Sequence, residues 1–271
     1  MKSKLTIFFA FLLLWTQAFS QQKDSPYKTS LKVDGSAIVA GFGISYLGLT
    51  LIQNKKPLTD AQLASVAKSD VFFIDRHTAG DFSDRADKDS YIPFYASFAA
   101  APIAALLNKN ERSHFGQVMV LFVETMALTG SVYTMTAGTV NRSRPLVYNT
   151  SLTSGERKSK DAQRSFFAGH TAATASATFF AAKVFSDFNP DSKAKPYVWA
   201  AGAAVPAVVG YMRYKAGKHF LTDNLLGYVI GAGAGILVPQ LHKKSGKENL
   251  TFQPFGGKDF QGASLTYTFS K

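Results

Sequence analysis

The stretch R-Y-K-A-G-K-H-F-L-T-D, from Arg213 to Asp223, gives the strongest indication of fold and chemistry in this chain. In it, His219 lies six residues after an arginine and four before a carboxylate, a spacing that suits attack on phosphorus. If His219 and Asp223 share a helix, they lie on one face, so the carboxylate can hydrogen-bond the imidazole. That bond would fix the tautomer and raise the basicity of the other ring nitrogen. Arg213 can present a fork of donors to phosphate oxygens.

Two further polar blocks lie upstream, N-R-S-R-P at residues 141–145 and S-F-F-A-G-H-T at residues 165–171. In this order the three blocks resemble the signature of the type 2 phosphatidic-acid phosphatase and vanadium haloperoxidase superfamily, K-x6-R-P, P-S-G-H and S-R-x5-H-x3-D. The likeness covers about residues 115–240 and is specific because three separated blocks agree in order. The matching residues are Arg144, Pro145, Gly169, His170, Arg213, His219 and Asp223.

The resemblance implies a metal-independent phosphoric ester hydrolase that needs no cofactor. His219 would attack phosphorus and form a phosphohistidine, and His170 would protonate the leaving oxygen. Asp223 would complete the catalytic group as the partner of His219. The predicted phosphate-binding residues are Arg144, Gly169 and Arg213, with Arg142 as an auxiliary cation.

Three positions depart from the superfamily pattern. Ala137 replaces the lysine expected seven residues before Arg144, Ala168 replaces the serine before Gly169, and Met212 replaces the serine before Arg213. The missing lysine and the second-block serine would normally hold phosphate oxygens, so two contacts are absent. The cations that could restore positive charge are Arg142, Lys215 and Lys218.

The composition favours one folded domain with an anionic partner. The chain has 271 residues, of which 46% are hydrophobic and 18% charged, and this excludes disorder for most of it. Its net charge of +12 favours phosphorylated substrates or an anionic lipid surface, and the basic residues form no nucleic-acid-binding module. The absence of cysteine excludes disulfides and thiolate metal sites.

Residues 1–20 have the basic start, apolar centre and small-residue cleavage site of a signal peptide, with an uncleaved membrane anchor as the alternative. We expect residues 21–34 to be a flexible segment and residues 35–242 to form an acid phosphatase-like helical bundle. Residues 243–271 would form a linker and a β-hairpin whose Leu265 packs on the bundle.

The expected fold is therefore all-α, a bundle of about six main helices followed by a small C-terminal β-hairpin. The high content of Ala and Gly in these segments should let the helices approach one another closely. The predicted helices cover residues 36–53, 91–107, 115–138, 165–185, 197–212 and 223–237, with a short helix after Thr59.

Several polar residues that could have a function lie outside the three blocks. The acidic group at residues 70–90 suggests a metal site, but its spacing matches no calcium loop and a solvated connector is preferred. Glu124, inside the longest apolar run, would pair with a cation or support the site. The histidines that fit no constellation are His77, His114 and His242.

The predicted localisation depends on how many helices cross the membrane before the first block. The signal would leave residue 21 outside the cytoplasm, and three crossings before the first block would then put that block inside. We therefore expect a periplasm-facing site in a bacterial cell envelope, on a bundle that is soluble or only partly embedded. The run at residues 91–107 is short and contains two prolines, so it is the candidate that does not cross.

Three functions are compatible with these observations. A phosphatase acting on phosphoesters or diphosphates of envelope lipids comes first, because basic charge and apolar helices suit an amphiphile. A vanadate-dependent haloperoxidase is the second, since vanadate mimics phosphate. The third is a phosphate-lipid binder weakened by the changes at Ala137 and Ala168.

Overall fold

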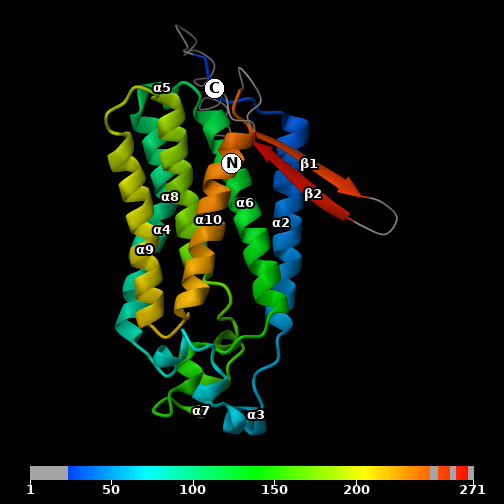
Figure 1. The fold of residues 1–271 in the computed structure, drawn as a ribbon, viewed down its shortest axis with the longest axis vertical. Helices are drawn as coiled ribbons and strands as arrows, with labels where there is room; N and C mark the ends of the chain where they lie inside the picture. Colours follow the sequence, from blue (N-terminus) through cyan, green and yellow to red (C-terminus); the bar gives the residue numbers. More distant parts are fainter. Residues whose placement is uncertain (1–23, 245–249, 257–260, 268–271) are drawn as a thin grey trace, which may run out of the picture.

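The computed structural model describes residues 24–244, 250–256 and 261–267. Within these ranges, six long helices stand side by side and alternate in direction, which confirms the predicted all-α bundle (Figure 1). The six helices are α2 Leu31–Asn54, α4 Asp84–Leu107, α6 Phe115–Thr139, α8 Gly169–Phe188, α9 Lys195–Lys215 and α10 Leu221–Leu241.

Short elements occupy the connections and distinguish the two ends of the bundle. One end carries α3 Asp60–Ser65 and α7 Ser154–Lys158, and the other carries α5 Lys109–Arg112 (Figure 1). We call these the α7 end and the α5 end. Four 3-10 turns complete the connections, η1 Lys68–Asp70, η2 Arg76–Thr78, η3 Pro145–Tyr148 and η4 Asp161–Gln163.

Capping residues define where several helices begin. Thr59 is the predicted N-cap of α3, and its hydroxyl accepts from the backbone N–H of Gln62 at 3.2 Å. Ser83 caps α4 by accepting from the N–H of Ala86 at 3.2 Å. The helix therefore starts at Asp84 rather than at residue 91, and with 24 residues it is not the short segment expected from the sequence.

Glycines on α10 bring its backbone against α8. A Cβ added to Gly227, Gly231 or Gly235 would lie 2.5, 2.0 and 2.5 Å from carbonyl oxygens of α8. Their spacing of four residues puts them on one face, so the seam continues over two turns. The carbonyls that they meet belong to Ala168, Ala172 and Ser176.

The segment before α2 is tied down at the α5 end, so the flexible segment expected over residues 21–34 does not fit residues 24–34. Tyr27 is buried, and its hydroxyl donates to Asp187 at 2.8 Å. It also forms a β-bridge with Lys243, beyond the end of α10. The remainder of that segment and the predicted signal peptide lie outside the described residues.

Strands β1 Leu250–Gly256 and β2 Gln261–Tyr267 pair antiparallel as the expected hairpin, with Leu250 opposite Tyr267. The hairpin projects away from the bundle (Figure 1). Leu265 and Tyr267 stay 56% and 51% exposed, so the expectation that Leu265 packs on the bundle is wrong. A hairpin of two strands has no second layer that could bury the face carrying Leu265 and Tyr267.

The outer surface of the bundle is apolar. Four helices, α2, α4, α6 and α10, are long and apolar enough to cross a membrane. Large apolar side chains remain exposed along them, an arrangement that suits contact with lipid. Examples are Val39, Phe42, Ile92, Ile103, Leu225 and Val229.

Candidate active site

The third sequence block forms the turn between α9 and α10 at the α7 end. Gly217 adopts φ +68°, and a Cβ there would lie 1.9 Å from the carbonyl oxygen of Asp81. Glycine thus permits both the left-handed conformation and the close approach. The carbonyl of Gly217 in turn accepts from the N–H of Leu146 at 3.1 Å, so this turn is joined to the first block.

His219 is buried in that turn, with 1% of its surface exposed. Its Nδ1 lies 2.6 Å from the carbonyl oxygen of Ser165, in the second block. A carbonyl can only accept, so Nδ1 carries the proton and Nε2 keeps the lone pair of the neutral ring. The ring therefore has the tautomer that a nucleophile needs at Nε2.

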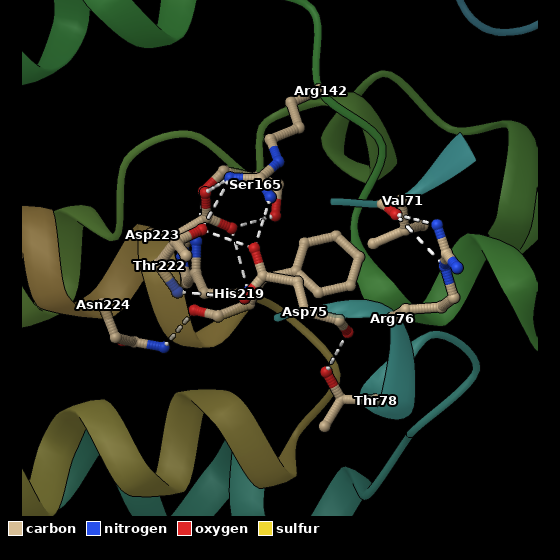
Figure 2. Close-up of polar contacts among 11 residues, drawn as sticks. Val71, Asp75, Arg76, Thr78, Arg142, Ser165, His219, Thr222, Asp223 and Asn224 are labelled. Carbon is tan, nitrogen blue, oxygen red and sulfur yellow. Dashed lines mark hydrogen bonds and ion pairs between the residues drawn. The ribbon is translucent and has the colours of Figure 1, made fainter. Parts of the chain in front are cut away.

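The hydrogen bond expected between Asp223 and the imidazole is replaced by this backbone contact. Helix α10 begins at Leu221, so His219 precedes it and does not share a helical face with Asp223. Asp223 instead caps the helix, accepting from the N–H of Phe220 at 2.9 Å, and accepts from the hydroxyl of Ser165 at 2.6 Å. It thus acts on the imidazole indirectly, by holding the residue whose carbonyl orients the ring (Figure 2).

Arg142 lies between two buried carboxylates. It donates to Asp223 through Nη1 and to Asp75 through Nη2, the latter at 2.7 Å (Figure 2). Asp75 also accepts from the backbone N–H of Thr222 at 3.1 Å. The predicted auxiliary cation therefore fastens the start of α10 to the loop before α4.

Arg144 and Arg213 are both buried and each is held by a carboxylate. Nη1 of Arg144 lies 2.7 Å from Asp161, and Nη1 of Arg213 forms an ion pair with Asp87. The Nε atoms of both arginines are buried without a hydrogen-bond partner among the described residues. A buried donor without an acceptor is costly, so both guanidinium groups have capacity for an anion.

His170 is the second residue of α8, and its ring packs on α4. The ring centroid lies 4.3 Å from that of Phe94 and 5.2 Å from that of Tyr91. Gly169, the residue before His170, is the first residue of α8. The free N–H groups in the first turn of a helix favour a bound anion. A Cβ on Gly169 would lie 2.4 Å from the ring of Tyr133, so glycine permits the close approach of that ring.

Charge interactions connect the four predicted groups, His170, His219, Arg144 and Arg213. Burial, followed by the charges of Arg144 and Arg213, lowers the pKa of His219 well below its usual value, and His170 adds to this effect. Burial and the same two arginines lower the pKa of His170 to about 3. Both imidazoles are therefore neutral in the free protein at neutral pH, under the influence of two nearby cations.

A further cation, Lys218, contributes to the site from the α9–α10 turn. Its Nζ lies 3.1 Å from the carboxylate of Asp87 that also holds Arg213. Ala137, where the superfamily has lysine, is fully buried in the last turn of α6. Ala168 is the N-cap of α8 without a side-chain hydrogen bond, so no hydroxyl is present there.

Sequence reasoning did not identify the carboxylates and the hydroxyl that support these cations. Asp75 and Asp87 belong to the acidic group at residues 70–90, so the interpretation of that group as a solvated connector is wrong for these two. Asp161 would have its pKa raised by burial, but Arg144 and Arg164 lower it to about 2. Their sequence signal is weak, because an aspartate in a polar loop is usually solvated.

Comparison with known proteins agrees with this geometry. Residues 118–247, just under half of the chain, match the family model described as PAP2 superfamily, and this match confirms the resemblance of the three blocks. The match supports a phosphatase or haloperoxidase-like activity in broad terms. No curated protein and no solved structure matches the chain.

Proposed function

We propose that the protein is a phosphatase that hydrolyses lipid phosphoesters or diphosphates through a phosphohistidine at His219. The observation that carries this proposal is the pair of buried guanidinium groups, Arg144 and Arg213, whose Nε atoms find no hydrogen-bond partner in the part of the chain that the structure describes. Both groups act electrostatically on His219, whose Nε2 is available for attack. An anion with several acceptor oxygens would satisfy both arginines beside a nucleophile.

In the first step, the Nε2 lone pair of His219 attacks phosphorus and the bond to the ester oxygen breaks. The leaving oxygen takes a proton from His170, whose ring gains it once the negative substrate offsets the charges of Arg144 and Arg213. The two arginines stabilise the charge on the equatorial oxygens. Lys218 is positioned to supply the cation that Ala137 lacks.

In the second step, water attacks phosphorus while neutral His170 accepts its proton, and the P–N bond to His219 breaks. The products are inorganic phosphate and an alcohol from a monoester, or inorganic phosphate and a lipid monophosphate from a diphosphate, so each turnover consumes one water molecule. Ser165 keeps the imidazole oriented throughout, since its carbonyl accepts from Nδ1 and its hydroxyl is held by Asp223.

The surroundings of the site favour an amphiphilic substrate. Aromatic rings on α4 continue from His170 along the bundle, with Phe94 5.0 Å from Phe98 and Tyr91 stacked on Tyr95 at 5.8 Å. Tyr95 is exposed on the same apolar surface that would face lipid. A phosphate in the site would therefore place its hydrocarbon chain next to apolar side chains.

The same apolar surface supports membrane association, with the catalytic groups at one face of the bilayer. The start of α2 and the end of α10 lie at the α5 end, opposite the site (Figure 1). If all the helices cross, the predicted signal places the site on the cytoplasmic side. The periplasm-facing site expected from the sequence requires a bundle that does not cross, and the apolar exposed faces of α2 and α4 favour crossing.

The test is phosphate release from a panel of lipid and soluble phosphoesters, measured on membranes and on soluble extract. We expect activity in the membrane fraction, and a loss of at least about a thousandfold in His219→Ala. The matched control is His77→Ala, because His77 contacts Tyr214 outside the site. Equal rates for wild type and His219→Ala would refute the proposal. Halide oxidation dependent on vanadate would favour the haloperoxidase alternative.

A further inference from the structure

A second group of titratable side chains lies at the α5 end, away from the candidate active site. Asp34 comes from the first turn of α2, Glu124 from α6, and His242 directly follows α10. One ligand atom from each lies within 4.8 Å of the others. His242 therefore does belong to a constellation, and Glu124 has the partners that the sequence left open.

The backbone contact of His242 shows which ring nitrogen carries the proton when the ring is neutral. Its Nδ1 lies 2.8 Å from the carbonyl oxygen of Val238, and a carbonyl can only accept. In the neutral ring, Nε2 then presents a lone pair toward two carboxylates. It lies 3.1 Å from Oδ1 of Asp34 and 3.5 Å from Oε2 of Glu124. In that tautomer three acceptor atoms converge on one point, whereas a ring protonated on both nitrogens would donate from Nε2 to Asp34.

Burial makes that convergence unfavourable unless a cation is present. The side chain of Asp34 is only 3% exposed. Its Oδ2 accepts from the N–H of Ser30 at 2.6 Å, whereas Oδ1 faces the cluster. Oε2 of Glu124 is buried without a hydrogen-bond partner among the described residues. Two carboxylates taken out of water need a positive charge between them.

The spacing of the three atoms suits a metal ion. Bonds of about 2.0–2.1 Å in a tetrahedral site separate neighbouring ligand atoms by about 3.3 Å. The two distances from His242 Nε2, 3.1 and 3.5 Å, lie on either side of that value. One imidazole with two carboxylates is a ligand set for a divalent transition metal.

We propose that Asp34, Glu124 and His242 bind a divalent transition-metal ion such as Zn²⁺, with water in the fourth position. The carbonyl of Val238 would orient the imidazole by accepting a hydrogen bond from Nδ1, the ring nitrogen that does not bind the metal. Metal-binding histidines commonly make such a contact. The ion would join α2, α6 and α10 at the end opposite the active site. It would therefore stabilise the folded bundle, since it binds the folded state in preference to the unfolded chain.

The test is titration of the full chain, purified in detergent and treated with chelator, with Zn²⁺ alone. We expect one ion per chain by calorimetry and a rise in the unfolding temperature on binding. His242→Ala and Glu124→Gln should each weaken binding at least about tenfold, and the second change keeps the shape of the side chain. His77→Ala, a histidine at the α7 end, should bind Zn²⁺ as the wild type does.

Two results would overturn this proposal. One is the absence of saturable Zn²⁺ binding to the wild type, with an unfolding temperature that responds to pH but not to metal, which would mean that a proton on His242 balances the two carboxylates. The other is wild-type affinity in a folded Glu124→Gln variant. If His242→Ala fails to fold, Asp34→Asn replaces it. Phosphate release is measured separately, so neither result depends on the proposed enzyme activity.

Discussion

Among the described residues, charged side chains at the two ends of the bundle leave opposite kinds of buried atom without a hydrogen-bond partner. At the α7 end these are donors, the Nε atoms of Arg144, Arg164 and Arg213. At the α5 end they are acceptors, on Glu111 and Glu124. Native proteins leave few such atoms, so each set points to something that completes it. The comparison teaches that one scaffold leaves buried donors unmatched at one end and buried acceptors unmatched at the other.

Replacing Arg213 with lysine tests the donor-rich end most strongly. Arg213→Lys keeps a positive charge but loses Nε and the planar fork, so we expect kcat/KM to fall about a hundredfold. Arg85→Lys is the matched control, because Arg85 is an exposed residue of α4 that pairs with Asp89. Steady-state phosphate release checks both. An unchanged rate in Arg213→Lys would remove the anion-binding interpretation of the unpaired Nε.

Removing the hydroxyl of Ser165 tests how this end positions its nucleophile. Ser165→Ala leaves the carbonyl that accepts from His219 but frees it from Asp223, so we expect kcat to fall about tenfold. KM should change little, because Ser165 would not touch the substrate. Ser159→Ala, at the end of α7, serves as the control. A larger change in KM than in kcat would contradict a positioning role.

Glu111 at the α5 end and His219 at the α7 end should affect the pH dependence of stability in opposite directions. Burial raises the pKa of Glu111 to about 7, so between about 4.5 and 7 the unfolded chain loses this proton first and stability falls as pH rises. The pKa of His219 is lowered, so its contribution is complete above about 6.5 and is lost as pH falls below that value.

Glu111→Gln should therefore flatten the decline in stability toward neutral pH, and the variant should be more stable than wild type at pH 8. Chemical unfolding followed from pH 5 to pH 8 measures the effect, with exposed Asp89→Asn as the control. A difference between Glu111→Gln and wild type that does not vary with pH would show that Glu111 does not titrate in this range.

Much of the bundle was predictable because its signals are local. Apolar runs, the Thr59 cap and small residues predicted the helices and their close packing. The three blocks predicted which residues would gather, because such blocks mark the helix ends of one superfamily. Electrostatic coupling of His219 with Arg144, Arg213 and His170 is consistent with that gathering.

The residues that hold His219 and the arginines in place could not be predicted, and the reason is physical. The partner of His219 is a backbone carbonyl, which every residue possesses, so its position has no signature in the sequence. The expected contact with Asp223 assumed that a helix includes both residues, but α10 begins only at Leu221. Likewise, the aspartates that hold the arginines are distinguished only by how the loops fold together.

The glycine seam between α8 and α10 has a consequence for protein engineering. His170 lies in the first turn of α8 and His219 lies two residues before α10, and backbone meets backbone along Gly227, Gly231 and Gly235. The spacing of the two imidazoles is thus fixed from inside the bundle, independently of the outward-facing side chains. The apolar exterior could therefore be replaced with polar residues to obtain a water-soluble version that keeps the spacing of the two imidazoles.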